Sequence, residues 1–177
     1  QSWGYNTYTI TAGGPVPGVL DNKLRFFFAG ERNYNGGTAT NWHGITLDTV
    51  MTSFGKELPV QVNYGAGPYP GYFNGQWDIN GNLSYAPSPS LRLKFGGTYH
   101  AGKDRNGGSW NNLQNYDKNQ LNKRWNSSAY FKFTHQVSPR MFYTLNLNYF
   151  YYTREWGDPD LWHDVAKYGD PELNPEK

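Results

Sequence analysis

The sequence predicts an all-β protein, and more specifically a fragment of an antiparallel transmembrane β-barrel. Three observations favour this fold class. Several segments alternate between apolar and polar residues, tyrosine and tryptophan gather near the ends of those segments, and short turns alternate with long connections along the chain. These features are typical of barrels whose apolar face contacts lipid and whose polar face lines the interior.

The composition is that of a chain rich in strands and turns. Aromatic residues make up 18% of its 177 residues, the hydrophobic fraction is only 37%, and there are 21 glycines. Leucine, isoleucine and valine, the usual builders of a soluble core, are scarce. The length suits one domain, so we expect residues 1–177 to form part of a single β-barrel domain.

Charge, cysteine content and hydropathy exclude several classes of protein. The formal net charge of +2 is too small to indicate a nucleic-acid partner. The chain has no cysteine, which excludes a disulfide framework and a thiolate metal site. No apolar run approaches the roughly 18 residues of a transmembrane helix, whereas a barrel strand needs only about 9–11 residues.

Six strands in three hairpins are expected from the alternation. The expected strands cover residues 5–12, 23–32, 76–85, 91–101, 125–136 and 141–152. Proline-containing turns at 86–90 and 137–140 join the last two pairs. The segments 33–75, 102–124 and 154–177 show no periodicity, so they are predicted to be long extracellular loops opposite short periplasmic turns. Residues 45–51 could form a short helix or strand within the first of them.

The shared phase of these strands defines one apolar face. Its expected members are Leu24, Phe26, Phe28, Trp77, Ile79, Leu83, Leu91, Leu93, Phe95, Phe131, Phe133, Leu145 and Leu147. Trp77, Tyr85, Tyr99, Tyr143, Tyr149 and Tyr151 fall near strand ends on that face, as interfacial aromatic residues do. Leu93 is expected mid-strand, so an arginine there should impair assembly far more than loss of its neighbour Lys94.

The opposite face carries polar and charged residues, which suits a water-filled lumen. The predicted lumen-facing residues are Arg25, Glu31, Asp78, Arg92, Lys94 and Lys132. We expect them to form a hydrogen-bonded ladder that supports the strands. Six strands cannot close a barrel by themselves, because single-chain bacterial barrels begin at about eight strands. The chain is therefore expected to be a fragment that ends within a loop.

Two motifs resemble the early barrel strands of TonB-dependent outer-membrane receptors. The segment Gly13-Gly14-Pro15-Val16, followed by Asp21 to Glu31 with its Lys-Leu-Arg-Phe-Phe-Phe run, is similar to the first barrel hairpin of that family. The segment Asn82 to Leu93, with its Pro-Ser turn, is similar to the hairpins that follow, and the tail around 168–175 resembles the family's extracellular loops. The likeness spans most of the chain and is strongest at residues 13–31.

The resemblance implies a transporter of the bacterial cell outer membrane that takes up a scarce ligand through a plugged barrel of about 22 strands. It implies four partners: outer-membrane lipid, the plug domain and remaining barrel of the same parent chain, TonB acting through that parent, and an unknown small ligand. The sequence departs from the family pattern because it contains neither a plug nor a segment recognisable as contacting TonB. We therefore expect the isolated chain not to transport.

Two other functions stay open. The same alternation fits a soluble carbohydrate-binding β-sheet module, in which the aromatic residues would form a sugar platform, because a half-buried antiparallel sheet also alternates. A porin-type barrel that does not depend on TonB is the second. A requirement for detergent would distinguish the module, and an upstream plug domain would distinguish the porin.

No enzyme, cofactor or metal site is predicted. The four histidines lack metal-ligand spacing, and the aspartates of the last loop lack the pattern of a calcium loop. No nucleophile elbow or phosphate loop occurs. Aromatic loop residues are the best ligand-binding candidates, since they could stack on a sugar or an apolar ligand, although interfacial anchoring or loop packing would also explain them. These candidates are Trp110, Tyr116, Trp156, Trp162 and Tyr168.

Overall fold

The computed structural model describes residues 4–36, 43–67, 71–105, 119–170 and 172, and in this part of the chain it is all-β. Its strands are β1 (Asn6–Pro15), β2 (Leu24–Asn35), β3 (Ile45–Ser53), β4 (Lys56–Tyr64), β5 (Phe73–Ser88), β6 (Leu91–Arg105), β7 (Leu121–Ser138) and β8 (Met141–Gly157). Two single 3-10 turns, η1 (Leu20–Asn22) and η4 (Lys167–Gly169), complete it. No helix within these ranges is long and apolar enough to cross a membrane.

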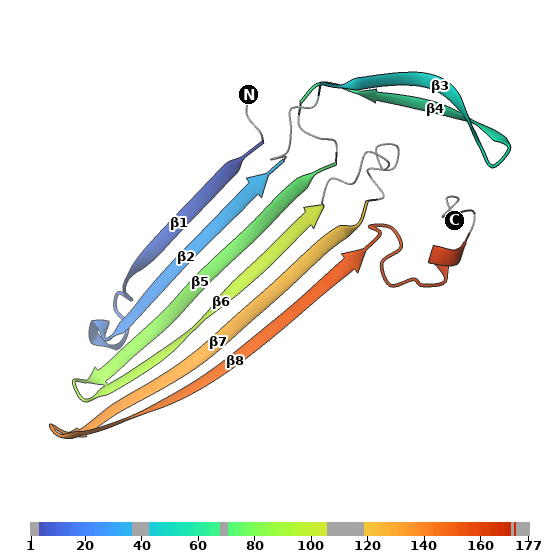
Figure 1. The fold of residues 1–177 in the computed structure, drawn as a ribbon. Helices are drawn as coiled ribbons and strands as arrows, with labels where there is room; N and C mark the ends of the chain where they lie inside the picture. The colour runs from blue at the N-terminus through green and yellow to red at the C-terminus, as the bar shows by residue number, and fades with distance from the viewer. Residues whose placement is uncertain (1–3, 37–42, 68–70, 106–118, 171, 173–177) are drawn as a thin grey trace.

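Six strands form one antiparallel sheet in the order β1-β2-β5-β6-β7-β8 (Figure 1). The sheet is open, with β1 and β8 at its edges. Residues 16–23, 89–90 and 139–140 connect strands at one end, which we call the short-turn end. At the other end, which we call the long-connection end, β2 ends beside the start of β5 and β6 ends beside the start of β7. The predicted alternation of short and long connections is therefore confirmed.

The strand register confirms the predicted apolar face. Residues directly opposite each other in an antiparallel pair project to the same side of the sheet. Phe26 lies opposite Leu83, which lies opposite Phe95, and the row continues through Phe131 to Leu147. All thirteen residues predicted for the face share its phase, and β1 adds Tyr8, Ile10 and Ala12.

No layer of described residues covers this face. Ile10, Leu83, Phe95 and Leu147 are all at least 45% exposed. Among the described residues the buried hydrophobic side chains are those of Val60 and Leu121. A soluble sheet of this size would bury one face, so the exposed apolar side marks a surface that contacts an apolar environment or another macromolecule.

Aromatic side chains bound the apolar face at both ends. Tyr85 and Tyr143 lie toward the short-turn end, and Trp77, Tyr99 and Trp125 lie toward the long-connection end. Ten residues of β6 separate the row of Tyr143, at Leu91, from the row of Trp77 and Trp125, at Ala101. That length is about 34 Å along a strand, or about 26 Å along the axis of a barrel with strands tilted by roughly 40°. The spacing matches the apolar band of about 25 Å in outer-membrane barrels.

The prediction that residues 33–75 form one long loop is wrong, because the middle of this segment forms the separate hairpin β3–β4. Residues 45–51 are therefore a strand rather than a helix, and the described chain has eight strands rather than six. Pro59 lies within β4 and cannot donate a ladder hydrogen bond. A proline inside a segment argues against a strand, so the sequence does not predict β4. Its turn also lacks the usual Asn-Gly signal, since the two left-handed positions are Phe54 (φ 51°) and Gly55 (φ 76°).

Two glycines at the centre of the sheet allow close side-chain and strand packing. The Tyr130 ring covers Gly96 on the polar face, where a Cβ atom would lie 2.6 Å from the tyrosine hydroxyl. A Cβ on Gly97, which belongs to the apolar face, would overlap the backbone carbonyl oxygen of Ser128. Backbone atoms cannot move aside as a flexible side chain can, so β6 and β7 need glycine at position 97.

We therefore expect Gly97→Ala to destabilise the sheet by about 1–3 kcal/mol, the usual cost of forcing extra atoms into a tight contact. Gly81→Ala is the matched control because Gly81 lies opposite Gly97 and its added Cβ would meet only the Phe27 carbonyl oxygen, at 3.5 Å. Urea unfolding in detergent micelles, followed by tryptophan fluorescence, measures both variants. Equal unfolding midpoints for the two would contradict the close approach of β6 and β7.

Candidate functional site

The face opposite the apolar one carries the polar chemistry of the sheet. A continuous row runs from Glu31 through Asp78, His100 and Asn126 to Tyr152. The row nearer the long connections contains Gln76, Gly102, Arg124 and Arg154, also in register. These residues reach this face because, in each strand, they occupy the positions that alternate with those of the apolar face.

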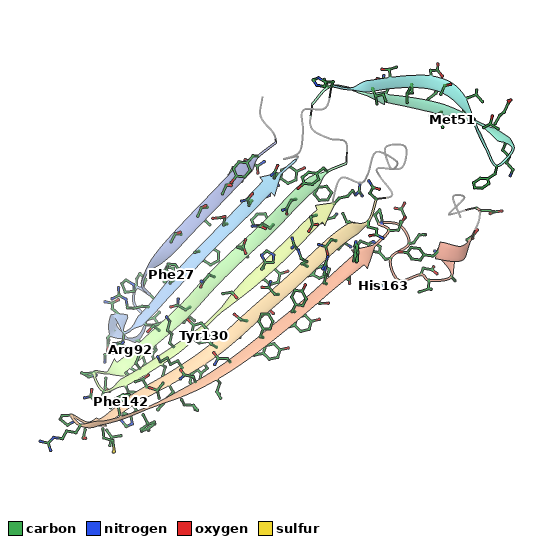
Figure 2. All side chains as sticks on the ribbon, viewed as in Figure 1. Phe27, Met51, Arg92, Tyr130, Phe142 and His163 are labelled. Carbon is green, nitrogen blue, oxygen red and sulfur yellow. The ribbon has the colours of Figure 1, made fainter. Side chains whose placement is uncertain are left out.

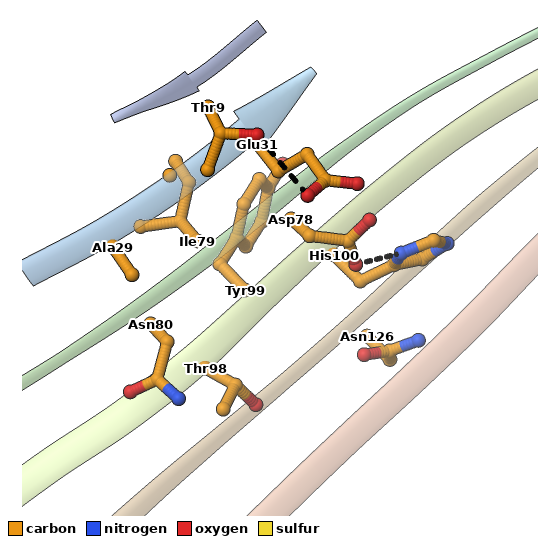
Figure 3. Close-up of a pocket in the computed structure, with 11 residues that line it drawn as sticks. Thr9, Ala29, Glu31, Asp78, Ile79, Asn80, Thr98, Tyr99, His100 and Asn126 are labelled. Carbon is orange, nitrogen blue, oxygen red and sulfur yellow. Dashed lines mark hydrogen bonds and ion pairs between the residues drawn. The ribbon is translucent and has the colours of Figure 1, made fainter. Parts of the chain in front are cut away.

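A shallow hollow of about 340 Å³ lies over the centre of β2, β5, β6 and β7 (Figure 3). Its polar lining comes from Thr9, Glu31, Asp78, Asn80, Thr98, His100 and Asn126. The His100 imidazole donates from Nδ1 to Asp78 Oδ1 at 2.7 Å, and Thr9 Oγ1 lies 3.4 Å from Glu31 Oε2. Carboxylates, hydroxyls and amides are thus offered together to whatever occupies the space above the sheet.

A tighter hydrogen-bond network lies between this hollow and the long connections. Asp104 accepts from Asn122 Nδ2 at 2.8 Å and pairs with Arg124 Nη2 at 3.0 Å. Asn122 Oδ1 in turn accepts from Arg154 Nε at 2.7 Å. Asn122 is only 7% exposed, so its amide is satisfied on both sides inside the network. The arrangement fixes the spacing of β6, β7 and β8 where the sheet meets its long connections.

The six predicted lumen-facing residues all lie on the polar face, but the structure separates them by charge. Glu31 and Asp78 are direct neighbours in the central row. The four basic residues Arg25, Arg92, Lys94 and Lys132 lie toward the short-turn end, where Lys94 faces Lys132 directly. Figure 2 labels Arg92 near these turns. The Lys94 ammonium is 5.8 Å from the Tyr130 ring centroid. The polar face is therefore acidic at its centre and basic toward the short turns.

Strand β8 adds apolar surface to the polar face, to which β2 also contributes Phe27. Four aromatic residues of β8 alternate with its apolar-face residues and are each more than half exposed: Phe142, Phe150, Tyr152 and Trp156. An aromatic strip beside charged groups is a surface suited to protein or to an amphipathic ligand.

The structure does not gather the predicted aromatic ligand-binding residues into one site. Trp156 lies on the polar face beside Arg154, whose guanidinium carbon is 5.5 Å from its ring. Trp162 and Tyr168 instead pack near Gly157, which belongs to the other face. Tyr168 Oη accepts from the Asp158 amide at 3.1 Å, and Nζ of Lys123 on β7 lies 3.6 Å from the Trp162 ring centroid. Trp110 and Tyr116 lie outside the described residues.

The Asp104 network was missed from sequence because the expected strands ended too early. The expected strand 91–101 extends to Arg105, and the expected strand 125–136 begins at Leu121. Both extensions keep the same phase, with Asp104, Asn122 and Arg124 on the polar face. The sequence does contain a signal for these extensions. Polar and charged residues continue β6 beyond its last aromatic residue, Tyr99, and precede Trp125 in β7.

The described residues contain no group of three or more His, Cys, Asp or Glu side chains arranged to hold a metal ion. Comparisons of the chain with protein-family models, with curated proteins and with solved structures find no match.

We expect Asp104→Ala to lower the free energy of unfolding by about 1–3 kcal/mol, because it leaves a buried amide and a guanidinium without their acceptor. Glu31→Ala removes a carboxylate from the same face whose hydrogen bond with Thr9 is long, at 3.4 Å, so its effect should stay within about 0.5 kcal/mol. Denaturant unfolding of the two variants measures both values. A cost for Glu31→Ala equal to that of Asp104→Ala would argue against a structural role for the network.

Proposed function

We propose that this chain forms part of the β-barrel of a TonB-dependent receptor in the bacterial outer membrane, where it contributes to uptake of a scarce ligand. The observation that carries the proposal is the register. It places an exposed apolar face, bounded by aromatic residues about 26 Å apart, on the side opposite a charged and hydrogen-bonding face. Lipid satisfies the first face and a wet interior satisfies the second.

The open edges of the sheet are consistent with this proposal. Edge strands present unpaired backbone groups, and in lipid such groups must be satisfied by closure. Pairing of β1 and β8 with further strands would complete the barrel. The long-connection end then faces outward and the short-turn end faces the periplasm, as in bacterial outer-membrane barrels.

The TonB-dependent class is favoured over an open porin by two features. The segment that resembles the first barrel hairpin of the family forms a β-hairpin, in which Gly13 lies opposite Phe27 across β1 and β2. The polar face also offers an aromatic strip on β8, where a plug domain rather than water would be the natural occupant. In this proposal the plug and the remaining barrel are contributed by the same parent chain, TonB acts through that parent, and the ligand is a small molecule.

A soluble carbohydrate-binding sandwich is the second candidate. It needs a second sheet over the apolar face, and β3–β4, the only other sheet of the described chain, leaves that face exposed. It also needs its aromatic platform on one side, whereas Trp156 and Trp162 lie on different sides. A chain that is monodisperse in buffer without detergent would favour the sandwich and overturn the barrel.

Arginine substitutions at graded depth test the assignment of the lipid-facing side. The sequence-based expectation that Leu93 lies in the middle of its strand is wrong. Leu93 lies opposite Tyr85, one of the aromatic residues near the short-turn end. Phe95 lies closer to the middle and is 56% exposed. We expect Phe95→Arg to cost about 2–4 kcal/mol at the midplane, Leu93→Arg less, and Lys94→Ala about 0.5–1 kcal/mol.

Assembly of the complete barrel is measured by heat-modifiable gel mobility, which separates folded barrels from unfolded chain. The expected order of folded yield is Lys94→Ala above Leu93→Arg above Phe95→Arg. A lower yield for Lys94→Ala than for Phe95→Arg would mean that the inner and outer faces are reversed. Equal yields for all three would place neither face in lipid.

A further inference from the structure

The apolar face becomes basic at its long-connection end. From the row of Trp77 and Trp125 to the end of the strands, the sheet carries four basic side chains on this face, which we call the basic band: Arg32 in that row, and Lys103, Arg105 and Lys123 beyond it. The acidic residue that shares the face within the six strands is Glu155. The body of the face between the aromatic belts carries no Lys, Arg, Asp or Glu in these strands. Its charge is therefore confined to one end and is mostly positive.

Two members of the band form a like-charge pair. Lys103 lies directly opposite Lys123 across β6 and β7, an arrangement that destabilises a sheet unless an anion compensates it. Glu155 is the cross-strand neighbour of Lys123, but its carboxylate is paired with His163 Nε2 at 3.7 Å. No carboxylate of the described residues lies within 4.0 Å of either ammonium. Lys123 instead lies over the Trp162 ring, which holds its charge at this end of the face.

Arg32 is held in place without a carboxylate from the described residues. Its Nη1 donates to Asn6 Oδ1 at 2.8 Å. The guanidinium also lies 6.0 Å, 5.6 Å and 5.8 Å from the rings of Tyr8, Tyr34 and Trp77. One of its five N–H groups makes the Asn6 bond, so a fixed guanidinium presents further donors at the aromatic belt. Guanidinium geometry suits the paired oxygens of a phosphate.

We propose that the basic band binds the phosphate of an anionic lipid whose acyl chains lie along the apolar face. The proposal rests on the proposed membrane location, because the long-connection end of the face is then the outer headgroup level. Aromatic belts mark that level, and basic side chains just beyond them attract anionic headgroups. Arg32 and Lys103 are two strands apart, about 10 Å, which their long side chains can span around one headgroup.

A lipid explains the arrangement better than free phosphate does. Strand β6, which carries Lys103, continues directly into exposed Tyr99 and Phe95 on the same face, and β7, which carries Lys123, continues into Trp125. Charge and apolar surface are therefore contiguous, as one amphiphile requires. A soluble anion would use the band alone.

The test uses the chain in non-ionic detergent micelles and lipids with brominated acyl chains, which quench nearby tryptophans such as Trp77 and Trp125. Brominated phosphatidic acid should quench at a concentration roughly tenfold or more below that needed for brominated phosphatidylcholine, as expected for two basic side chains near a charged lipid surface. The double variant Lys103→Gln/Lys123→Gln should lose this preference. Soluble glycerol 3-phosphate should not compete.

The matched control is Lys94→Gln/Lys132→Gln, which removes the same charge from a directly opposed lysine pair of the same two strands, but on the polar face. It should keep the preference, and so should the charge-conserving pair Lys103→Arg/Lys123→Arg. Equal loss in the two glutamine variants, or loss in the arginine variant, would overturn the proposal, as would full competition by glycerol 3-phosphate. Equal quenching by both lipids would overturn the phosphate site alone. Absence of quenching by either, with a chain monodisperse in buffer, would overturn the membrane proposal as well.

Discussion

Cross-strand register is the constraint on which the rest of this structure depends. In an antiparallel sheet, opposed residues project to the same side, so five strand pairs in consistent register convert the alternations of six strands into two faces. A slip of one residue in any pair would move a whole strand's apolar residues to the polar side. The register shifts in the six-stranded sheet fall next to the short turns, between Tyr85 and Ser88 and between Gln136 and Ser138, so the body of the sheet keeps its phase.

The two faces require different surroundings, and this requirement gives the sheet its functional meaning. Excluding water from the exposed leucine and phenylalanine side chains lowers the free energy, whereas the hydrogen bonds of the Asp104 network are already made within the sheet. The hollow around His100 and Asp78 has polar groups that water or a polar partner can reach. An environment apolar on one side and aqueous or proteinaceous on the other satisfies both, which is the situation of a barrel wall.

Charge is distributed along the strands as well as across them. Strands β6 and β7 carry two directly opposed lysine pairs, one on each face and at opposite ends: Lys94 with Lys132, and Lys103 with Lys123. Each pair places an ammonium near an aromatic ring, that of Tyr130 or of Trp162. Cation–π contacts stabilise a lysine without neutralising it. Both ends of the sheet therefore keep positive charge available to partners on different sides.

The sequence by itself determined which residues of each strand share a face, because alternation is a local property. A shift of the register by two residues leaves every side chain on the same face. The sequence indicated the six strands of the sheet, the short turns and the polarity of residues such as Asp78 and Lys94. It did not predict β4, since Pro59 and the Phe54-Gly55 turn lack local strand and turn signals. It also stopped β6 and β7 short, because the aromatic pattern ends before Asp104 and Asn122.

Only the tertiary structure decided how these faces are divided. Pairing brought Asp104, Asn122 and Arg154 together from three strands, and it placed Lys103 opposite Lys123. Such contacts depend on which strands are neighbours and on their relative stagger, which are long-range quantities that no single segment encodes. The separation of Trp156 from Trp162 has the same origin, because the segment after β8 folds back toward Lys123 through a contact between residues far apart in sequence.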